Sequence, residues 1–334
     1  MVESLLKQYG YTDRQIKQFL ESYPISLYRE ETLFEYIKRN YSFFESLGYT
    51  NEQIIKMSLD FPKVYTYSSS VLSSKLDFLK SLGFSDEQVI KISSGKSRFF
   101  SVSTDSLKIK IEYMKSLGCL ESDILKIFLN SQVLYSASLA SIEQKVSSLE
   151  SLGYTKDQII KMTVKFPEII GLSFSSLKQR ISEFENLGYT KDEILRMTVT
   201  FPAVYSYSMD NIKRKLSCIR ELGYTDDEIR SITLALPAIF GYSSESLKEK
   251  ILYLKEIGLE RVVVSRTKSL MQSVDLTYAR YNFLMDNNVS INLGILFSGD
   301  KIFSKRFGIC KKDLLELYSY DNDVRKSSKV NIKK

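Results

Sequence analysis

Apolar residues recur along this chain at helical spacing, and the spacing itself repeats. After Gly153, the residues Ile159, Met162 and Phe166 stand three and four positions apart, which places them on one face of a helix. A second apolar stripe of the same kind runs up to the next glycine of the pattern, Gly188. The pattern therefore predicts two amphipathic helices in each repeat.

Eight glycines mark the repeat, each preceded by an apolar residue and usually followed by an aromatic one. They are Gly10, Gly48, Gly83, Gly118, Gly153, Gly188, Gly223 and Gly258. The first interval is 38 residues and each later interval is 35. We expect each marker glycine to end the second helix in the left-handed conformation, and Asn288 to take this place in a shortened last repeat.

The first helix of each repeat has a recognisable start. Two residues after the glycine stands Thr or Ser in six repeats, with Gln or Glu three residues later. The pairs are Thr12–Gln15, Thr50–Gln53, Ser85–Gln88, Thr155–Gln158, Thr190–Glu193 and Thr225–Glu228. This spacing is typical of a capping box, in which the two side chains satisfy each other's backbone N–H groups.

The end of the first helix is marked as well. All five prolines lie at this turn, fourteen residues after a marker glycine: Pro24, Pro62, Pro167, Pro202 and Pro237. Ser97, Gln132 and Gln272 take the place elsewhere. Proline cannot donate to the preceding helical turn, so the helix should end there. The short apolar link that follows is expected to form a single 3₁₀ turn beneath the helices. A serine six residues after the proline position, such as Ser208, should cap the second helix.

One repeat cannot bury its own two stripes, whereas stacked repeats can. The sequence therefore predicts an all-α fold, a right- or left-handed α-solenoid of about eight helix-turn-helix repeats of ~35 residues, extending as a single domain over residues 1–320. Its expected units lie near 1–47, 48–82, 83–117, 118–152, 153–187, 188–222, 223–257 and 258–288, followed by a C-terminal cap at 289–320. Residues 321–334 are expected to form a disordered basic tail.

The recurring string Leu-Gly-Tyr-Thr, then Phe-Pro, then Leu-Gly resembles the motif of the mitochondrial transcription termination factor family, the mTERF family. It is clearest over 152–187 and 187–222, and it extends over about residues 5–310. Pentatricopeptide repeats have the same period, but their proline directly follows the glycine. TAL-effector-like repeats need a variable residue pair between their helices, and the link here is mostly apolar. The resemblance implies a helical-repeat protein that binds duplex DNA or structured RNA and acts in transcription termination, transcription regulation or RNA metabolism.

Composition excludes several classes of site. The chain has no histidine, which removes the usual general base and the commonest zinc ligand. The cysteines Cys119, Cys218 and Cys310 are isolated and are expected to be small buried or half-buried side chains. The string Gly95–Lys96–Ser97 resembles the end of a phosphate-binding P-loop but lacks the upstream glycine and the preceding strand. We therefore expect no enzyme, no metal and no cofactor.

Two rows of basic residues follow the same period. The row of the first helices, eight residues after each glycine, reads Gln18, Lys56, Lys91, Lys126, Lys161, Arg196, Ser231 and Arg266. The row of the second helices, eight residues before the next glycine or Asn288, reads Asn40, Lys75, Lys110, Lys145, Arg180, Lys215, Lys250 and Arg280. Stacking would line up each row along the solenoid, where it could neutralise nucleic-acid phosphates. The first row should face solvent, and the second should flank the apolar stripe and line a groove, so we prefer the second.

The net charge of +7 permits nucleic acid as a partner without proving it. The alternative is a protein-binding solenoid scaffold, including an effector of an intracellular bacterium. The aromatic residues at the repeated positions, such as Tyr154, Tyr189, Tyr205 and Phe240, are expected to pack in the core. We expect a monomer with no membrane contact. The family implies a mitochondrial or chloroplast location, but no transit peptide is visible, which leaves a bacterial or host cytoplasm open.

Overall fold

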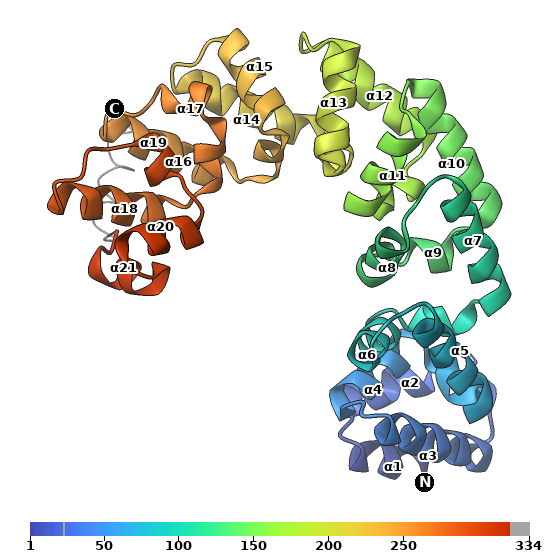
Figure 1. Ribbon diagram of the computed structural model, residues 1–334. Coiled ribbons are helices and arrows are strands. Elements are labelled where there is room, and N and C mark those ends of the chain that lie inside the picture. Colours follow the sequence, from blue (N-terminus) through green and yellow to red (C-terminus); the bar gives the residue numbers. More distant parts are fainter. Residues whose placement is uncertain (23, 321–334) are drawn as a thin grey trace. The chain divides into compact units, whose positions relative to one another are not determined.

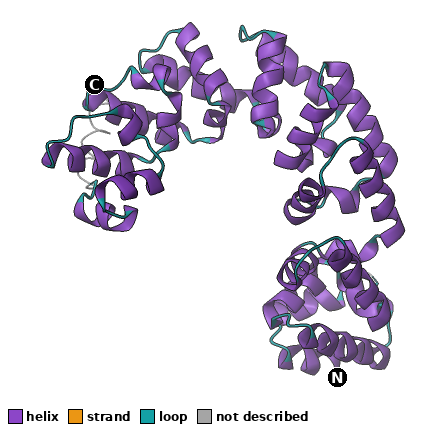
Figure 2. Ribbon diagram, in the orientation of Figure 1, coloured by secondary structure: helices purple, strands orange, loops and turns teal. Residues whose placement is uncertain are grey.

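The computed structural model describes residues 1–22 and 24–320. Over this part of the chain all regular secondary structure is helical (Figure 2). By compactness the chain divides into an N-terminal unit, Met1–Lys178, and a C-terminal unit, Gln179–Lys334. Each unit is a stack of two-helix repeats, so the prediction of an all-α helical-repeat fold is confirmed. The proposed tail, 321–334, lies outside the described residues.

The first helices of the repeats are about ten residues long in the middle of the chain. They are α2 (Asp13–Leu20), α4 (Asn51–Asp60), α6 (Asp86–Gly95), α8 (Glu121–Asn130), α11 (Lys156–Lys165), α13 (Lys191–Thr200), α15 (Asp226–Ala235) and the short α17 (Val262–Ser265). In the N-terminal unit α4 packs against α2 and α6, and α8 packs against α6 and α11. In the C-terminal unit α15 packs between α13 and α17.

The second helices form their own layer and, apart from α1, are longer. They are α1 (Val2–Gln8), α3 (Glu30–Ser46), α5 (Ser69–Ser81), α7 (Thr104–Ser116), α10 (Leu139–Leu152), α12 (Phe174–Glu185), α14 (Met209–Glu221), α16 (Ser244–Glu256) and α18 (Val274–Asp286). Within the N-terminal unit α3 packs against α1 and α5, and within the C-terminal unit α16 packs against α14 and α18. First helices thus pack on first helices, and second on second (Figure 1).

A single turn joins the two helices of each repeat. In most repeats it is a 3₁₀ turn, as predicted, and in one it is a short α-helix. The turns are η1 (Ile25–Leu27), η2 (Pro62–Thr66), η3 (Ser97–Ser101), α9 (Val133–Ser136), η4 (Pro167–Gly171), η5 (Pro202–Ser206), η6 (Pro237–Gly241) and η7 (Thr267–Met271). Four prolines open their turns at the first position. Pro24 directly precedes η1.

The predicted helix boundaries are confirmed in detail. All six capping boxes form with both reciprocal hydrogen bonds. All eight marker glycines have positive φ, between 71° and 109°, and Asn288 has φ of 53°. The fourth repeat has no capping box: the residue before α8 is Leu120, whose side chain is 66% exposed and makes no capping bond. Local signals therefore mark most of the helix boundaries, although α8 begins without one.

The eighth repeat departs from the register that the sequence suggested. Helix α17 has only four residues, so η7 begins at Thr267, only nine residues after Gly258. Thr267, and not Gln272, therefore takes the proline position. Gln272 instead lies in extended conformation just after η7. A deletion of five residues in the first helix, with the second helix intact, explains the 30-residue spacing from Gly258 to Asn288.

The C-terminal segment does not form another two-helix repeat. Three short helices, α19 (Leu293–Leu296), α20 (Asp300–Phe307) and α21 (Lys311–Leu317), follow α18, and α21 packs against it (Figure 1). Phe303 and Leu314 join the buried face of α18 through Leu276 and Ala279. This small core covers apolar surface of α18.

Candidate nucleic-acid interface

The basic row of the second helices is buried, contrary to expectation. The exposed fractions are 4% for Lys110, 7% for Lys145, 4% for Lys215 and 1% for Arg280. Lys75 and Lys250 are partly buried. Burial lowers the pKa of each of the five lysines below its usual value. These ammonium groups do not point into an open groove.

Each buried ammonium group donates to a backbone carbonyl at the turn of the following repeat. The bonds run from Lys75 to Val102 O (2.5 Å), from Lys110 to Leu134 O (2.9 Å), from Lys145 to Leu172 O, from Lys215 to Phe240 O and from Lys250 to Leu270 O (2.8 Å). These carbonyls lie in, or just after, the short turn between the two helices. Such a turn is too short to supply hydrogen-bond donors to its own last carbonyl groups. A lysine of the preceding repeat supplies the donor instead.

The other members of the row achieve the same result with different chemistry. Asn40, fully buried, donates through Nδ2 to Tyr65 O (2.7 Å) and Tyr67 O (2.9 Å). Arg280 donates to Leu296 O (3.1 Å) and Ser298 O (2.6 Å), and it forms an ion pair with Asp300 at 2.9 Å. Arg180 differs: its guanidinium lies 3.3 Å from Glu183, with 15% of the side chain exposed.

The predicted orientation of this row is therefore wrong. Lys75, Lys110, Lys145, Lys215 and Lys250 join neighbouring repeats, and Arg280 joins α18 to the C-terminal segment. Asn40 makes the same kind of contact without a charge, which indicates that a hydrogen-bond donor is enough at this position. Contact of these residues with nucleic acid stays a prediction, and their geometry does not favour it. Reversing the charge of Lys215 would set a carboxylate against the carbonyl of Phe240, so the effect on the fold would obscure any effect on binding.

The basic row of the first helices is exposed, as predicted. Its members are Lys56, Lys91, Lys126 and Lys161 in the N-terminal unit and Arg196 in the C-terminal unit. Gln18 and Ser231 are also exposed. Because consecutive first helices pack side by side within a unit, the N-terminal unit carries its four lysines on one helical layer.

Arg266 does not belong to this row. The shortened α17 places Arg266 at the end of the first helix, with φ of −141° and ψ of 61°, the conformation that Leu236 has at the equivalent end of α15. The expected position of Arg266, eight residues after Gly258, does not allow for the five-residue deletion in α17. The guanidinium approaches Gly294 in the segment that follows α18.

An acidic row lies one helical turn before the exposed basic row. Its members are Glu52, Glu87, Asp157, Asp192 and Asp227. Lys161 pairs with Asp157 at 2.6 Å, and Lys126 pairs with Asp123 at 3.1 Å. Exposed pairs of this kind contribute about 0–1 kcal/mol, so they hold the lysines only weakly. Among the described residues, Lys56 and Lys91 form no ion pair within 4 Å.

Comparison with known proteins agrees with the geometry. The sequence model of the mTERF family matches residues 3–293, which is most of the chain. The chain belongs to the mTERF family. A search of curated proteins finds no match. The helical repeat of this mTERF chain therefore rests on its family as well as on its structure, whereas the support for nucleic-acid binding comes from the family.

The aromatic residues of this mTERF protein are part of the core, as predicted. Tyr154, Tyr189, Tyr205 and Phe240 are at most 6% exposed. The tyrosine after the marker glycine also links repeats: the hydroxyl of Tyr189 lies 2.7 Å from Thr233 Oγ1, and that of Tyr11 lies 2.6 Å from Ser58 Oγ. Base stacking on these rings has no support, because the rings are not accessible.

The fold explains the P-loop-like string and the cysteines. Gly95 ends helix α6, and Lys96 follows it as the cap, so the Gly95–Lys96–Ser97 string is not a P-loop. Cys119 and Cys218 are buried as expected, whereas Cys310 is exposed and caps α21 by accepting the Asp313 N–H at 3.4 Å. Within the described residues, no helix combines the length and the apolar character needed to cross a membrane.

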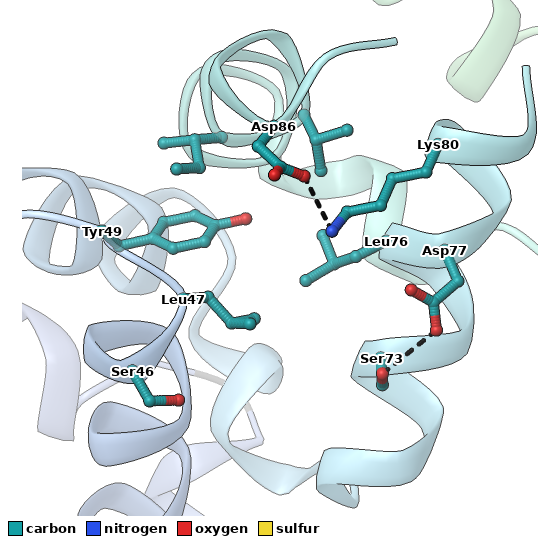
Figure 3. A pocket seen from close by; sticks show the side chains of 10 residues that line it. Ser46, Leu47, Tyr49, Ser73, Leu76, Asp77, Lys80 and Asp86 are labelled. Atoms are coloured by element: carbon teal, nitrogen blue, oxygen red, sulfur yellow. Dashed lines mark hydrogen bonds and ion pairs between the residues drawn. The ribbon is translucent and has the colours of Figure 1, made fainter. Parts of the chain in front are cut away.

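The hollows between helices differ in charge. Between the second and first helices of the N-terminal unit, a pocket of about 280 Å³ holds an ion pair of Lys80 with Asp86 at 2.7 Å, next to Asp77 and Tyr49 (Figure 3). The same place in the C-terminal unit holds a pair of Arg220 with Asp226 at 2.5 Å. Every cation that lines these two pockets forms an ion pair, including Arg230 with Glu193, so neither pocket offers a free cation to a ligand.

Proposed function

We propose that this mTERF protein binds nucleic acid, duplex DNA or structured RNA, through the phosphate backbone. The observation that carries the proposal is the exposed row on the first helices of the N-terminal unit, Lys56, Lys91, Lys126 and Lys161; Arg196 has the equivalent position on a first helix of the C-terminal unit. Packed helices lie about 8–10 Å apart, so neighbouring rungs can each meet a different phosphate of one strand. Phosphate contacts fix position and carry no sequence information by themselves.

Family membership supports placing this binding in transcription termination, transcription regulation or RNA metabolism. The usual organellar setting of the family, and action as a monomer, belong to the same proposal. Binding would be led by electrostatics, with bases read only secondarily, because the exposed cations lie on helices while the aromatic side chains at the repeated positions, such as Tyr154 and Tyr189, are buried. No catalytic step is part of the proposal.

A second candidate is a protein-binding scaffold, and the acidic row favours it. Glu52, Glu87, Asp157, Asp192 and Asp227 give the layer of first helices both signs of charge, which suits a partner helix that also carries both signs. The two candidates differ in their dependence on salt and on partner. The affinity for nucleic acid should fall steeply and uniformly as the salt concentration rises. The affinity for a protein partner with both signs of charge should depend on salt much less.

The test is a salt series with three probes of equal length: duplex DNA, single-stranded DNA and an RNA hairpin. Fluorescence anisotropy would give the dissociation constant at each salt concentration. A linear fall of log K with log salt, with a slope of several units for the duplex or the hairpin, supports the proposal. Absence of binding to all three probes at low salt contradicts it.

A further inference from the structure

One hollow of the N-terminal unit gathers cations without neutralising them. It lies along the groove between α4 and α6, reaches the end of α8, and has a volume of about 800 Å³. Three lysines line it: Lys56 from α4, and Lys91 and Lys96 from α6 and its cap. Glu87 is the single carboxylate that lines it. The lining thus carries an excess of two positive charges.

The groove one repeat earlier provides the contrast. The hollow between α2 and α4 measures about 640 Å³ and is built from the same repeat positions. It contains one lysine, Lys56, and two carboxylates, Glu52 and Asp60. Its lining therefore has an excess of one negative charge. Repeat geometry alone does not make an anion site. The difference comes from Lys56 in the place of Gln18, from Gly95 in the place of Asp60, and from Lys96.

Lys96 lies deepest in the charged hollow, because it is half-buried while Lys56 and Lys91 are exposed. Its ammonium group donates to Phe128 O at 3.2 Å and to Leu129 O, at the end of α8. An ammonium group has three N–H donors, so one donor has no acceptor among the described residues. Burial and the charge of Lys91 lower the pKa of Lys96, and Glu168 raises it, with a result of about 8. Lys96 is thus a partly desolvated cation that no carboxylate pairs with directly.

We propose that the hollow between α4 and α6 binds one phosphate group of a polynucleotide backbone, with Lys96 as the innermost donor and Lys56 and Lys91 at the rim. This rests on the proposed function and adds a residue that is not in either periodic row. An anionic phosphate oxygen accepts from ammonium donors and supplies the charge that the site lacks. It also fixes the register of the strand, because the neighbouring hollow between α2 and α4 repels anions.

The test compares the full chain with Lys96→Met, Lys96→Arg and a charge-matched control, Lys108→Met. Lys108 is exposed on α7, 3.4 Å from Asp105 and away from the hollow. With a fluorescent 16-base-pair duplex, Lys96→Met should weaken binding roughly five- to tenfold and reduce the salt slope by about 0.9, the effect of one phosphate contact. Lys96→Arg should keep most of the affinity, and Lys108→Met should bind like the parent chain.

A second measurement observes Lys96 in the parent chain and uses a variant only to assign its resonance. In the parent chain labelled with ¹³C at lysine Cε, the Lys96 resonance, assigned with Lys96→Arg, reports its pKa. Adding the duplex should raise this pKa, because a bound anion favours the ammonium form. It acts in the same direction as Glu168 and Glu87, and against burial and the charges of Lys91 and Lys56. If the parent binds the duplex while Lys96→Met matches the control and the pKa does not move, this inference fails and the proposed function stands. If the parent binds no nucleic acid, both fail.

Discussion

The ammonium nitrogen of Lys110 lies 2.9 Å from the carbonyl oxygen of Leu134, one repeat further along the chain. The bond joins the second helix of one repeat to the turn of the next, and the same contact recurs with Lys75, Lys145, Lys215 and Lys250. A row of cations that reads in the sequence like a binding surface is therefore a device that joins repeats.

Replacing Lys110 should destabilise the fold. Lys110→Met keeps the aliphatic stem but leaves the buried carbonyl of Leu134 without its donor, at an expected loss of about 1–3 kcal/mol in the free energy of unfolding. Urea denaturation followed by circular dichroism would measure it. Lys108→Met, on the exposed side of the same helix, should stay within about 0.5 kcal/mol of the parent. Equal stability of the two variants would show that the bond to Leu134 O contributes nothing.

The fourth repeat, which has no capping box, offers a gain of stability. Leu120 has the backbone conformation of a helix cap, with φ of −72° and ψ of 153°, but no polar side chain. Leu120→Ser would let the hydroxyl accept the N–H of Asp123, so the free energy of unfolding should rise by about 0.5–1 kcal/mol. The reciprocal change, Thr190→Ala, should lower it by about 1 kcal/mol. A lower stability of Leu120→Ser in thermal denaturation would contradict this reading of the cap.

Buried tyrosines should make the fold labile to alkali. Burial raises the pKa of Tyr49 and of Tyr224 to about 12, against about 10 in an unfolded chain. The folded state therefore favours the neutral phenol. The resulting contribution to the free energy of unfolding is fully present below pH 10 and is lost as pH rises from 10 to 12. The buried lysines have the opposite effect: their lowered pKa makes stability rise with pH, but only up to their unfolded pKa near 10.5.

Urea titrations at pH 9, 10, 11 and 11.5 would show this loss. Tyr49→Phe removes one titrating group together with its 2.5 Å hydrogen bond to Ser93. The variant should be less stable than the parent at pH 9, and it should lose less stability between pH 10 and 11.5. An identical pH dependence for the two proteins would mean that Tyr49 does not titrate with a raised pKa.

Much of the fold could be predicted from sequence because its signals are local. A capping box, a proline and a glycine at positive φ each act within one turn of backbone, and the repeat writes them many times over. The register of the eighth repeat could not be predicted in this way. Counting from Gly258 assigns Arg266 to the basic row. The deletion is visible only when the repeat is aligned on its cap serine, because Ser273 caps α18 as Ser243 caps α16.

The direction of the second basic row could not be predicted from periodicity alone. A side chain that flanks an apolar stripe can point toward solvent or toward the next repeat. Which of the two it does depends on whether the loop of the next repeat offers it an acceptor. One signal was available in the sequence: Asn40 occupies the row in the first interval, and an amide can replace a lysine as a hydrogen-bond donor but not as a charge. Lys96 lies outside both periods, so periodicity could not indicate it.

The central claim is that exposed cations of the first helices, and not the buried cations of the second, contact nucleic acid. The most direct test is the slope of log K against log salt for the parent chain and for the triple variant Lys91→Met, Lys126→Met, Lys161→Met, measured on the same duplex or hairpin. All three residues are exposed, so folding should persist. The account predicts a slope reduced by about 2.7, or 0.9 for each lost phosphate contact. A slope and affinity equal to those of the parent chain would contradict it.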